Sequence, residues 1–283
     1  MFNQILCGNH LEILPRFPDD CFDMWLTSPP YDNLRTYEGY DFQFGPLARE
    51  LYRVLKPGGV GVWIVNDATI NGSETLTSAK QKIFFREVGF NIHDTMIYER
   101  STVPLNHHRY EQIFEYMFVF VKGKLNTFHG LRTNTLHPGN KRKCKPGHRN
   151  QRGEFKMSYG RIVGNSKLLG NIWSYDVGYG RMGDLFASEH PAIFPEKLAE
   201  DHLLSWSNPG DVVLDPMCGS GTTCKMAAKH GRQYVGIDIA EKYCEIARKR
   251  VALIEAQPLL FNENAGEQSL ARDPRKRGAS SVI

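Results

Sequence analysis

The stretch Ser28-Pro29-Pro30-Tyr31 stands at the end of a predicted strand and could do chemistry there. It follows the apolar run FDMWL at residues 22–26. Two successive prolines lack backbone N–H donors and hold φ near −65°, so they form a stiff extended corner whose carbonyl oxygens stay available as acceptors. A serine hydroxyl and a tyrosine ring flank this corner. The stretch indicates a rigid site for a group that donates hydrogen bonds.

A second stretch, DPMCGSGTT from Asp215 to Thr223, lies between a predicted strand and a predicted helix. Gly219 and Gly221 allow the sharp turn and close ligand approach of a nucleotide-type pocket at the carboxyl end of a parallel sheet. Asp238 ends the next predicted strand roughly 20 residues further on, where an acid hydrogen-bonds ribose hydroxyls. The Lys-Ser/Thr ending of a P-loop is missing, which disfavours ATP and GTP. With Asp215 expected at the mouth of the pocket, a cationic adenosine ligand fits, and S-adenosylmethionine is predicted.

The elements that must position these stretches alternate between strands and helices, as in βαβ units with a parallel sheet. Lys56-Pro57-Gly58-Gly59 is expected to stop the first long helix. The run 112–123 is predicted to be a long strand that leaves the sheet. Other strands are expected at 4–7, 22–26, 60–65, 211–215 and 233–238, helices at 44–55, 195–207, 222–231 and 240–257, and a helix followed by a strand within 78–98.

Residues 124–187 break this pattern, with many Gly and Asn residues and no sustained period. A basic run there contains Glu154 as its one acid, and such a run is either a solvated loop or a contact for nucleic-acid phosphates. The chain is therefore divided into a first α/β part (1–123), an insert (124–187), a second α/β part (188–257) and a disordered tail (258–283). The cations of the run are Lys141, Arg142, Lys143, Lys145, Arg149, Arg152, Lys156 and Arg161.

Composition bounds the class of protein. The chain has 283 residues, 41% of them hydrophobic, which is enough for a substantial core, and its formal charge of +4 excludes a grossly basic protein. Its six cysteines contain no CxxC pair, so neither a zinc site nor a disulfide framework is predicted. No leader sequence and no long apolar stretch is seen, so a cytoplasmic protein without membrane spans is expected.

Together the two stretches resemble the DNA amino-methyltransferases, which use S-adenosylmethionine to methylate cytosine N4 or adenine N6. Their catalytic motif [DNS]-PP-[YFW] is matched by Ser28 to Tyr31, and their Asp-Pro-Phe-x-Gly-x-Gly-Thr loop by Asp215 to Thr222, with Met217 in place of Phe. The catalytic motif comes first, an order similar to that of the beta group, whose insert is a target recognition domain. Residues 190–195 (HPAIFP) resemble that group's motif for the methionine end of the cofactor. The resemblance implies a circularly permuted Rossmann-like α/β sheet with an inserted target recognition domain.

The resemblance also implies roles for residues. Ser28 Oγ and the Pro29 carbonyl are expected to accept the two protons of the target amine, and Tyr31 to stack on the extruded base. Because the sulfonium is already activated, neither a nucleophilic cysteine nor a metal ion is expected. Pro30 completes the catalytic motif; cofactor contacts are expected from Asn9, Phe194, Asp215, Pro216, Cys218, Gly219, Gly221, Thr222 and Asp238, and DNA contacts from Lys141, Arg142, Lys143, Lys145, Arg149 and Arg152.

Several alternatives stay open. Serine at the first motif position resembles the N4-cytosine enzymes, whereas Asp or Asn there is typical of enzymes that act on adenine N6. N4-cytosine is therefore predicted, with adenine N6 as the alternative; methylation of RNA bases or protein glutamines is a second one, and a non-enzymatic DNA-binding module a third. The partner implied is double-stranded DNA in a bacterial or phage restriction-modification setting, with a cognate endonuclease and a homodimer also considered.

Overall fold

In the computed structural model, the described residues are 1–30, 42–100, 110, 112–136, 138–140, 148–156, 162–175 and 195–256. They fall into two compact units. The first holds the described residues up to His129 and from Asn171 onward, and the second holds those from Gly130 to Gly170. None of the described helices is long and apolar enough to cross a membrane.

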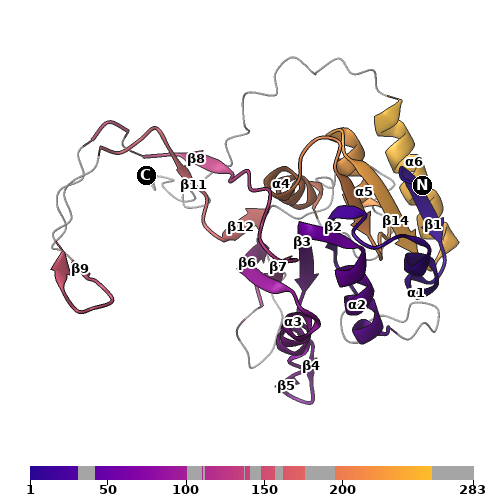
Figure 1. The fold of residues 1–283 in the computed structure, drawn as a ribbon, viewed down its shortest axis with the longest axis horizontal. Helices are drawn as coiled ribbons and strands as arrows, with labels where there is room; N and C mark the ends of the chain where they lie inside the picture. Colours follow the sequence, from indigo (N-terminus) through magenta and orange to yellow (C-terminus); the bar gives the residue numbers. More distant parts are fainter. Residues whose placement is uncertain are drawn as a thin grey trace, which may run out of the picture. The chain divides into compact units, whose positions relative to one another are not determined.

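An eight-stranded sheet forms the centre of the first unit, within the part of the chain that the structure describes (Figure 1). Five neighbouring strands run parallel, and β7 is antiparallel to both of its neighbours. The carboxyl ends of the five parallel strands therefore meet at one edge of the sheet. In spatial order the strands are β1 (Gln4–Cys7), β14 (Gln233–Asp238), β13 (Val212–Asp215), β2 (Phe22–Thr27), β3 (Leu55–Val65), β7 (Phe114–Val121), β6 (Asn91–Arg100) and β12 (Ile172–Tyr175).

The helices also follow the predicted order. They are α1 (His10–Ile13), α2 (Phe44–Val54), α3 (Thr77–Val88), α4 (Glu196–Trp206), α5 (Thr222–Lys229) and α6 (Glu241–Glu255), with the 3-10 turn η1 (Leu14–Arg16) after α1 and the short strands β4 (Thr69–Ile70) and β5 (Ser73–Glu74) before α3. The predicted alternation of strands and helices is thus confirmed.

One of two sequence predictions about this part of the sheet differs from the structure. The strand predicted to leave the sheet, β7, lies inside it between β3 and β6, because its residues from Met117 to Val121 are buried by neighbours on both sides. The expected stop of the first long helix is confirmed, because α2 ends at Val54; the residues after it form the start of β3, where Gly58 adopts a φ of +83°. The pairing of β3 with β2 shifts there, from Phe22 opposite Leu55 to Met24 opposite Val60, so the extra residues form a bulge.

Aromatic side chains build the core beneath α2 and α3. The Trp25 ring packs against Trp63, Phe85 and Phe120, with centroid separations of 5.8 to 6.2 Å. Gly61 makes room for it, because a Cβ there would lie 2.0 Å from the Trp25 ring. Trp25 is completely buried and so fixes which face of β2 points toward these helices.

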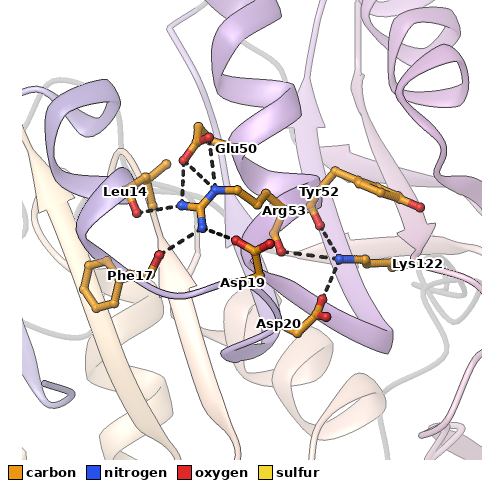
Figure 2. Close-up of polar contacts among 8 residues, drawn as sticks. All are labelled: Leu14, Phe17, Asp19, Asp20, Glu50, Tyr52, Arg53 and Lys122. Atoms are coloured by element: carbon orange, nitrogen blue, oxygen red, sulfur yellow. Dashed lines mark hydrogen bonds and ion pairs between the residues drawn. The ribbon is translucent and has the colours of Figure 1, made fainter.

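Arg53, in the last turn of α2, holds the loop that leads into β2 (Figure 2). Its guanidinium donates to the Phe17 and Leu14 carbonyls at 2.9 and 3.0 Å and pairs with Asp19 and Glu50. Lys122 adds bonds from its Nζ to Asp20 and to the end of α2. These contacts set the start of β2, and with it the position at which the strand ends.

The second unit is built from short antiparallel pairs. Strand β8 (Arg132–Asn134) pairs with β11 (Ser166–Leu168), and β9 (His148–Arg149) pairs with β10 (Phe155–Lys156). The predicted insert 124–187 encloses this unit. Residues 171–175 belong to the first unit, where β12 pairs with β6, and the predicted tail lies outside the described residues.

Candidate active site

The two stretches that carry the predicted chemistry leave the sheet from neighbouring strands. β13 pairs in parallel with β2, with Val213 opposite Met24 and Leu214 opposite Trp25. Ser28 directly follows the end of β2, and the glycine-rich loop directly follows Asp215 at the end of β13. Both stretches therefore begin at the same edge of the sheet. A further bond joins them, since Thr223 Oγ1 donates to the Leu26 carbonyl at 3.3 Å.

Glycine is required within the loop. Gly219 has a φ of +49° and Gly221 a φ of +79°, in the left-handed region that residues with a side chain rarely adopt. A Cβ on Gly221 would also lie 2.6 Å from the Cβ of Ala247 in α6. The Gly221 N–H donates to the Cys218 carbonyl at 2.7 Å, and this hydrogen bond closes the turn. The turn thus starts α5 close against α6.

Asp238, at the end of β14, holds the loop from the other side. Its Oδ2 accepts from the Gly219 N–H at 2.9 Å and its Oδ1 from the Ala240 N–H at 3.0 Å. Its carbonyl accepts from the Gly8 N–H at 2.9 Å, which brings the end of β1 to the same place. Asn9 follows there, and its Oδ1 caps α1 by accepting from the Leu11 N–H. This bond gives Asn9 a structural role beside the cofactor contact predicted for it.

Asp215 lies inside the protein rather than at the mouth of a pocket. It is 1% exposed, and its Oδ1 accepts from the Met217 N–H at 3.2 Å. Burial raises the pKa of Asp215 to about 6, although the hydroxyls of Thr223 and Thr27 oppose the rise. The sequence did not predict this burial, because it depends on the loop folding back over the carboxylate, where the Met217 N–H bonds to it.

Cys218 points into the protein beneath the loop. Burial raises the pKa of the Cys218 and Cys224 thiols well above the ordinary range, so both stay neutral. Both sulfurs pack against Gly236 of β14, where a Cβ would lie 3.0 and 2.8 Å from them. Any contact that Cys218 makes with a cofactor would therefore come from its backbone.

A buried ionic cluster, which the sequence prediction missed, supports the loop. Arg250 of α6 is completely buried, and its Nη1 donates to the Ser220 carbonyl at 2.6 Å and to Thr222 Oγ1 at 3.2 Å. Its Nη2 pairs with Glu196 at 2.7 Å, and Lys225 pairs with the same carboxylate oxygen at 2.6 Å. Arg250 thus joins the loop to the first residue of α4.

The sequence of α6 could have predicted that Arg250 is buried and paired. Arg250 lies on the same helical face as Ala247 and Ile246, three and four residues earlier, and both of these are buried. An arginine on an apolar face needs partners, so its position alone indicates a buried ionic contact. Glu196 follows Pro195, the last residue of the segment predicted to hold the methionine end of the cofactor.

Other predicted residues lie elsewhere. Arg152 is exposed in the turn between β9 and β10, where its N–H donates to Asn150 Oδ1 at 3.0 Å. The backbone of Arg149 lies in β9. Tyr31, Lys141, Arg142, Lys143, Lys145 and Phe194 lie outside the described residues.

Comparison with known proteins identifies the family. A family model described as DNA methylase (N6_N4_Mtase) matches residues 22–249, which is most of the chain. The chain belongs to the DNA amino-methyltransferases. It is 49% identical over 243 residues to the orphan methyltransferase M.BamHII of Bacillus amyloliquefaciens, covering 82% of this chain and 89% of that protein.

A more distant relative belongs to the same class of enzyme, and a solved structure gives the fold and the cofactor. The DNA adenine methyltransferase YhdJ of Escherichia coli is 27% identical, covering 87% of this chain and 82% of that protein. The structure of TTHA0409 from Thermus thermophilus, complexed with S-adenosyl-L-methionine, superposes with a TM-score of 0.61 at 25% identity, covering 89% of this chain and 93% of that one. The fold is thus that of the Rossmann-like DNA methyltransferases, and S-adenosylmethionine is the cofactor.

The residues at the sheet edge fit this cofactor. The loop offers a close approach at Gly219, and Asp238 lies beside it with a partly exposed carboxylate suited to ribose hydroxyls. Above its pKa of about 6, the Asp215 carboxylate would supply negative charge beneath the loop, which suits a ligand with a sulfonium and an ammonium group.

Replacing Asp215 by Asn is predicted to change how stability depends on pH. The folded-state pKa of about 6 exceeds the ordinary value of 3.8, so the native state binds more protons than the unfolded state between these values. The stabilisation from protonated Asp215 is complete below about pH 4 and is lost as the pH rises through about 6. From pH 4.5 to 7.5 the wild type should lose on the order of 2 kcal/mol relative to Asp215→Asn, measured by urea unfolding without cofactor. Parallel profiles would contradict the assignment.

Arg250 is predicted to position the cofactor loop. Arg250→Lys keeps the charge but loses the planar fork that reaches Ser220 and Glu196 together, so the dissociation constant for S-adenosylmethionine should rise about tenfold by calorimetry. The KM for the cofactor should rise with it, while kcat at saturating cofactor changes less than about threefold.

The matched control for this test is Lys225→Met. Lys225 pairs with the same Glu196 oxygen from the neighbouring helix, so the loss of that bond should leave cofactor affinity within about threefold. A fall in kcat at unchanged affinity in Arg250→Lys would show that the arginine does not act through the loop.

Proposed function

We propose that the protein transfers the methyl group of S-adenosylmethionine to the exocyclic N4 of a cytosine flipped out of double-stranded DNA. One observation carries the proposal: Ser28-Pro29-Pro30 follows β2 directly beside the loop that follows β13, held by the parallel pairing of these strands and by the Thr223 bond to the Leu26 carbonyl. This adjacency puts hydrogen-bond acceptors for an amine and a cofactor loop at one edge of the sheet.

The acceptors suit the chemistry of an aromatic amine. The lone pair of such an amine is delocalised into the ring, so the nitrogen becomes nucleophilic only when it turns pyramidal. Ser28 Oγ and the Pro29 carbonyl accept its two protons and favour that geometry, and the fixed proline φ angles hold the acceptors without reorganisation. Tyr31 stacks on the flipped base and replaces part of the stacking lost in the duplex.

The bound cofactor supplies an activated methyl group on a sulfonium sulfur. Asp238 binds its ribose hydroxyls, and the backbone of the loop from Asp215 to Thr222 lies against its methionine part. Phe194 and Asn9 are proposed to contact the cofactor from the segment before α4 and from the end of β1. Arg250 acts only by fixing the loop through Ser220 and Thr222.

The insert is proposed to be the target recognition domain, with the α/β parts 1–123 and 188–257 forming a permuted catalytic domain. The strand order supports this, since β13 and β14 from the second part lie between β1 and β2 from the first. Lys141, Arg142, Lys143, Lys145, Arg149 and Arg152 are proposed to contact DNA phosphates, which predicts binding that weakens steeply with salt.

Adenine N6 is the alternative target, favoured by the name of YhdJ, a DNA adenine methyltransferase at 27% identity. Serine at position 28 favours cytosine. RNA bases or protein glutamines are a weaker alternative, because the family model that matches most of the chain is described as a DNA methylase. The name of M.BamHII as an orphan methyltransferase favours an enzyme that works without a cognate endonuclease. A cytoplasmic location is proposed because the relatives are bacterial DNA methyltransferases.

The target base is decided by analysis of methylated DNA. A plasmid from a host without endogenous methylation is incubated with the enzyme and cofactor, digested to nucleosides and analysed by mass spectrometry. We expect N4-methylcytosine; N6-methyladenine alone would replace the cytosine proposal by its alternative. No methylated nucleoside from DNA, with transfer to RNA or protein, would overturn both.

The two stretches are proposed to have different roles, so substitutions in them should affect different quantities. Pro29→Ala and Tyr31→Ala should lower kcat at least a hundredfold while the dissociation constant for S-adenosylmethionine changes less than about threefold, because these residues act on the base. Asp238→Ala should raise that dissociation constant at least tenfold, since it removes the ribose acceptor and the Gly219 contact. An equal loss of cofactor affinity in all three variants would refute the division.

A further inference from the structure

A cluster of metal-ligating side chains lies at the end of β1, outside the residues used for methyl transfer. The Cys7 Sγ, one Glu241 carboxylate oxygen and the Cys244 Sγ all lie within 4.8 Å of one another. Cys7 and Glu241 are exposed, whereas Cys244 is buried. We propose that these three residues bind a thiophilic divalent cation of the zinc class.

The geometry needs little change to accommodate the ion. Two thiolates on one tetrahedral zinc ion, each at about 2.3 Å, lie about 3.8 Å apart, and a carboxylate oxygen on the same ion lies slightly closer to each sulfur. The observed upper limit of 4.8 Å thus requires shifts of about 1 Å, which side-chain rotation supplies. The exposed position of Cys7 and Glu241 leaves the fourth ligand position to water.

The charges around the cluster also suit a divalent ion. Two thiolates and one carboxylate carry three negative charges, which a divalent cation and the Arg248 guanidinium together neutralise. Arg248 pairs with Oε1 of Glu241, and its Nη2 also donates to the Ile5 carbonyl at 3.0 Å. Such an outer partner orients a ligating carboxylate. Binding releases the two thiol protons to solvent.

Sheet pairing and helix packing hold the ligands in place. Cys7 lies opposite Asp238 in the β1–β14 pair, and its Sγ is 3.6 Å from the Ile239 carbonyl oxygen. The Cys244 thiol donates to the carbonyls of Leu6 and Asp238, with Sγ–O distances of 3.7 and 3.6 Å, and metal binding replaces these weak hydrogen bonds when the thiol loses its proton. Thiolate ligands select soft or borderline ions, so zinc, cobalt and cadmium are expected to bind and magnesium is not.

The test uses the full chain, reduced and treated with a chelator, then titrated with Co²⁺. We expect one cobalt ion per chain, with a near-ultraviolet thiolate charge-transfer band and the visible spectrum of tetrahedral cobalt, both of which zinc abolishes. Cys7→Ser and Glu241→Gln should weaken cobalt binding at least tenfold. Both side chains are exposed, so these variants are expected to fold.

Cys21→Ser is the matched control, because it removes a partly buried thiol at the start of β2 and should keep the full cobalt signal. The proposal is overturned if the wild type shows no thiolate band, or if Cys7→Ser keeps it. As a second readout, zinc should raise the melting temperature of the wild type and of Cys21→Ser but not of Cys7→Ser. An equal shift in all three would also refute the site, and neither readout depends on methyl transfer.

Discussion

The parallel pairing of β2 with β13 is the constraint on which the rest of the structure depends. It joins segments about 190 residues apart, and Val212 N–H strengthens it by donating to Asp23 Oδ2 at 2.9 Å. A slip of one residue would turn Trp25 out of the aromatic core and shift Ser28 relative to the glycine-rich loop. The bulky core at Trp25 and the loop held by Arg53 at the start of β2 therefore fix the position of Ser28.

Charged side chains are buried around the loop, and their desolvation lowers the stability of the fold. Asp215 is held in a site that opposes its ionisation, and Arg250, Glu196 and Lys225 form a cluster whose desolvation offsets much of its attraction. Well-packed apolar residues could give similar stability at these positions. A cationic cofactor would interact favourably with an ionised Asp215, and a fixed loop would avoid an ordering cost when the proposed site binds that cofactor.

The sequence predicts the parallel α/β elements and the two stretches at their ends, because periodicity and turn residues are local properties. It could not predict that β7 enters the sheet, since strand order depends on packing between distant segments. The burial of Asp215 depends on a loop that folds back through Met217, which residue types alone do not reveal. The cysteine pattern shows the same limit: spacing along the chain finds only local pairs, whereas Cys7 and Cys244 meet through the pairing of β1 with β14.

The end of β14 connects the proposed methyl-donor site with the proposed cation site. The carboxylate of Asp238 holds Gly219 of the cofactor loop, while its carbonyl contacts Gly8 and the Cys244 thiol. An ion bound by Cys7, Glu241 and Cys244 would restrain the same strand end. If the ion changes cofactor affinity by some factor, the cofactor must change ion affinity by the same factor, because coupling between two binding equilibria is reciprocal. Because both proposed sites share the backbone at the end of β14, any such coupling would pass through that backbone and not through a contact between the two ligands.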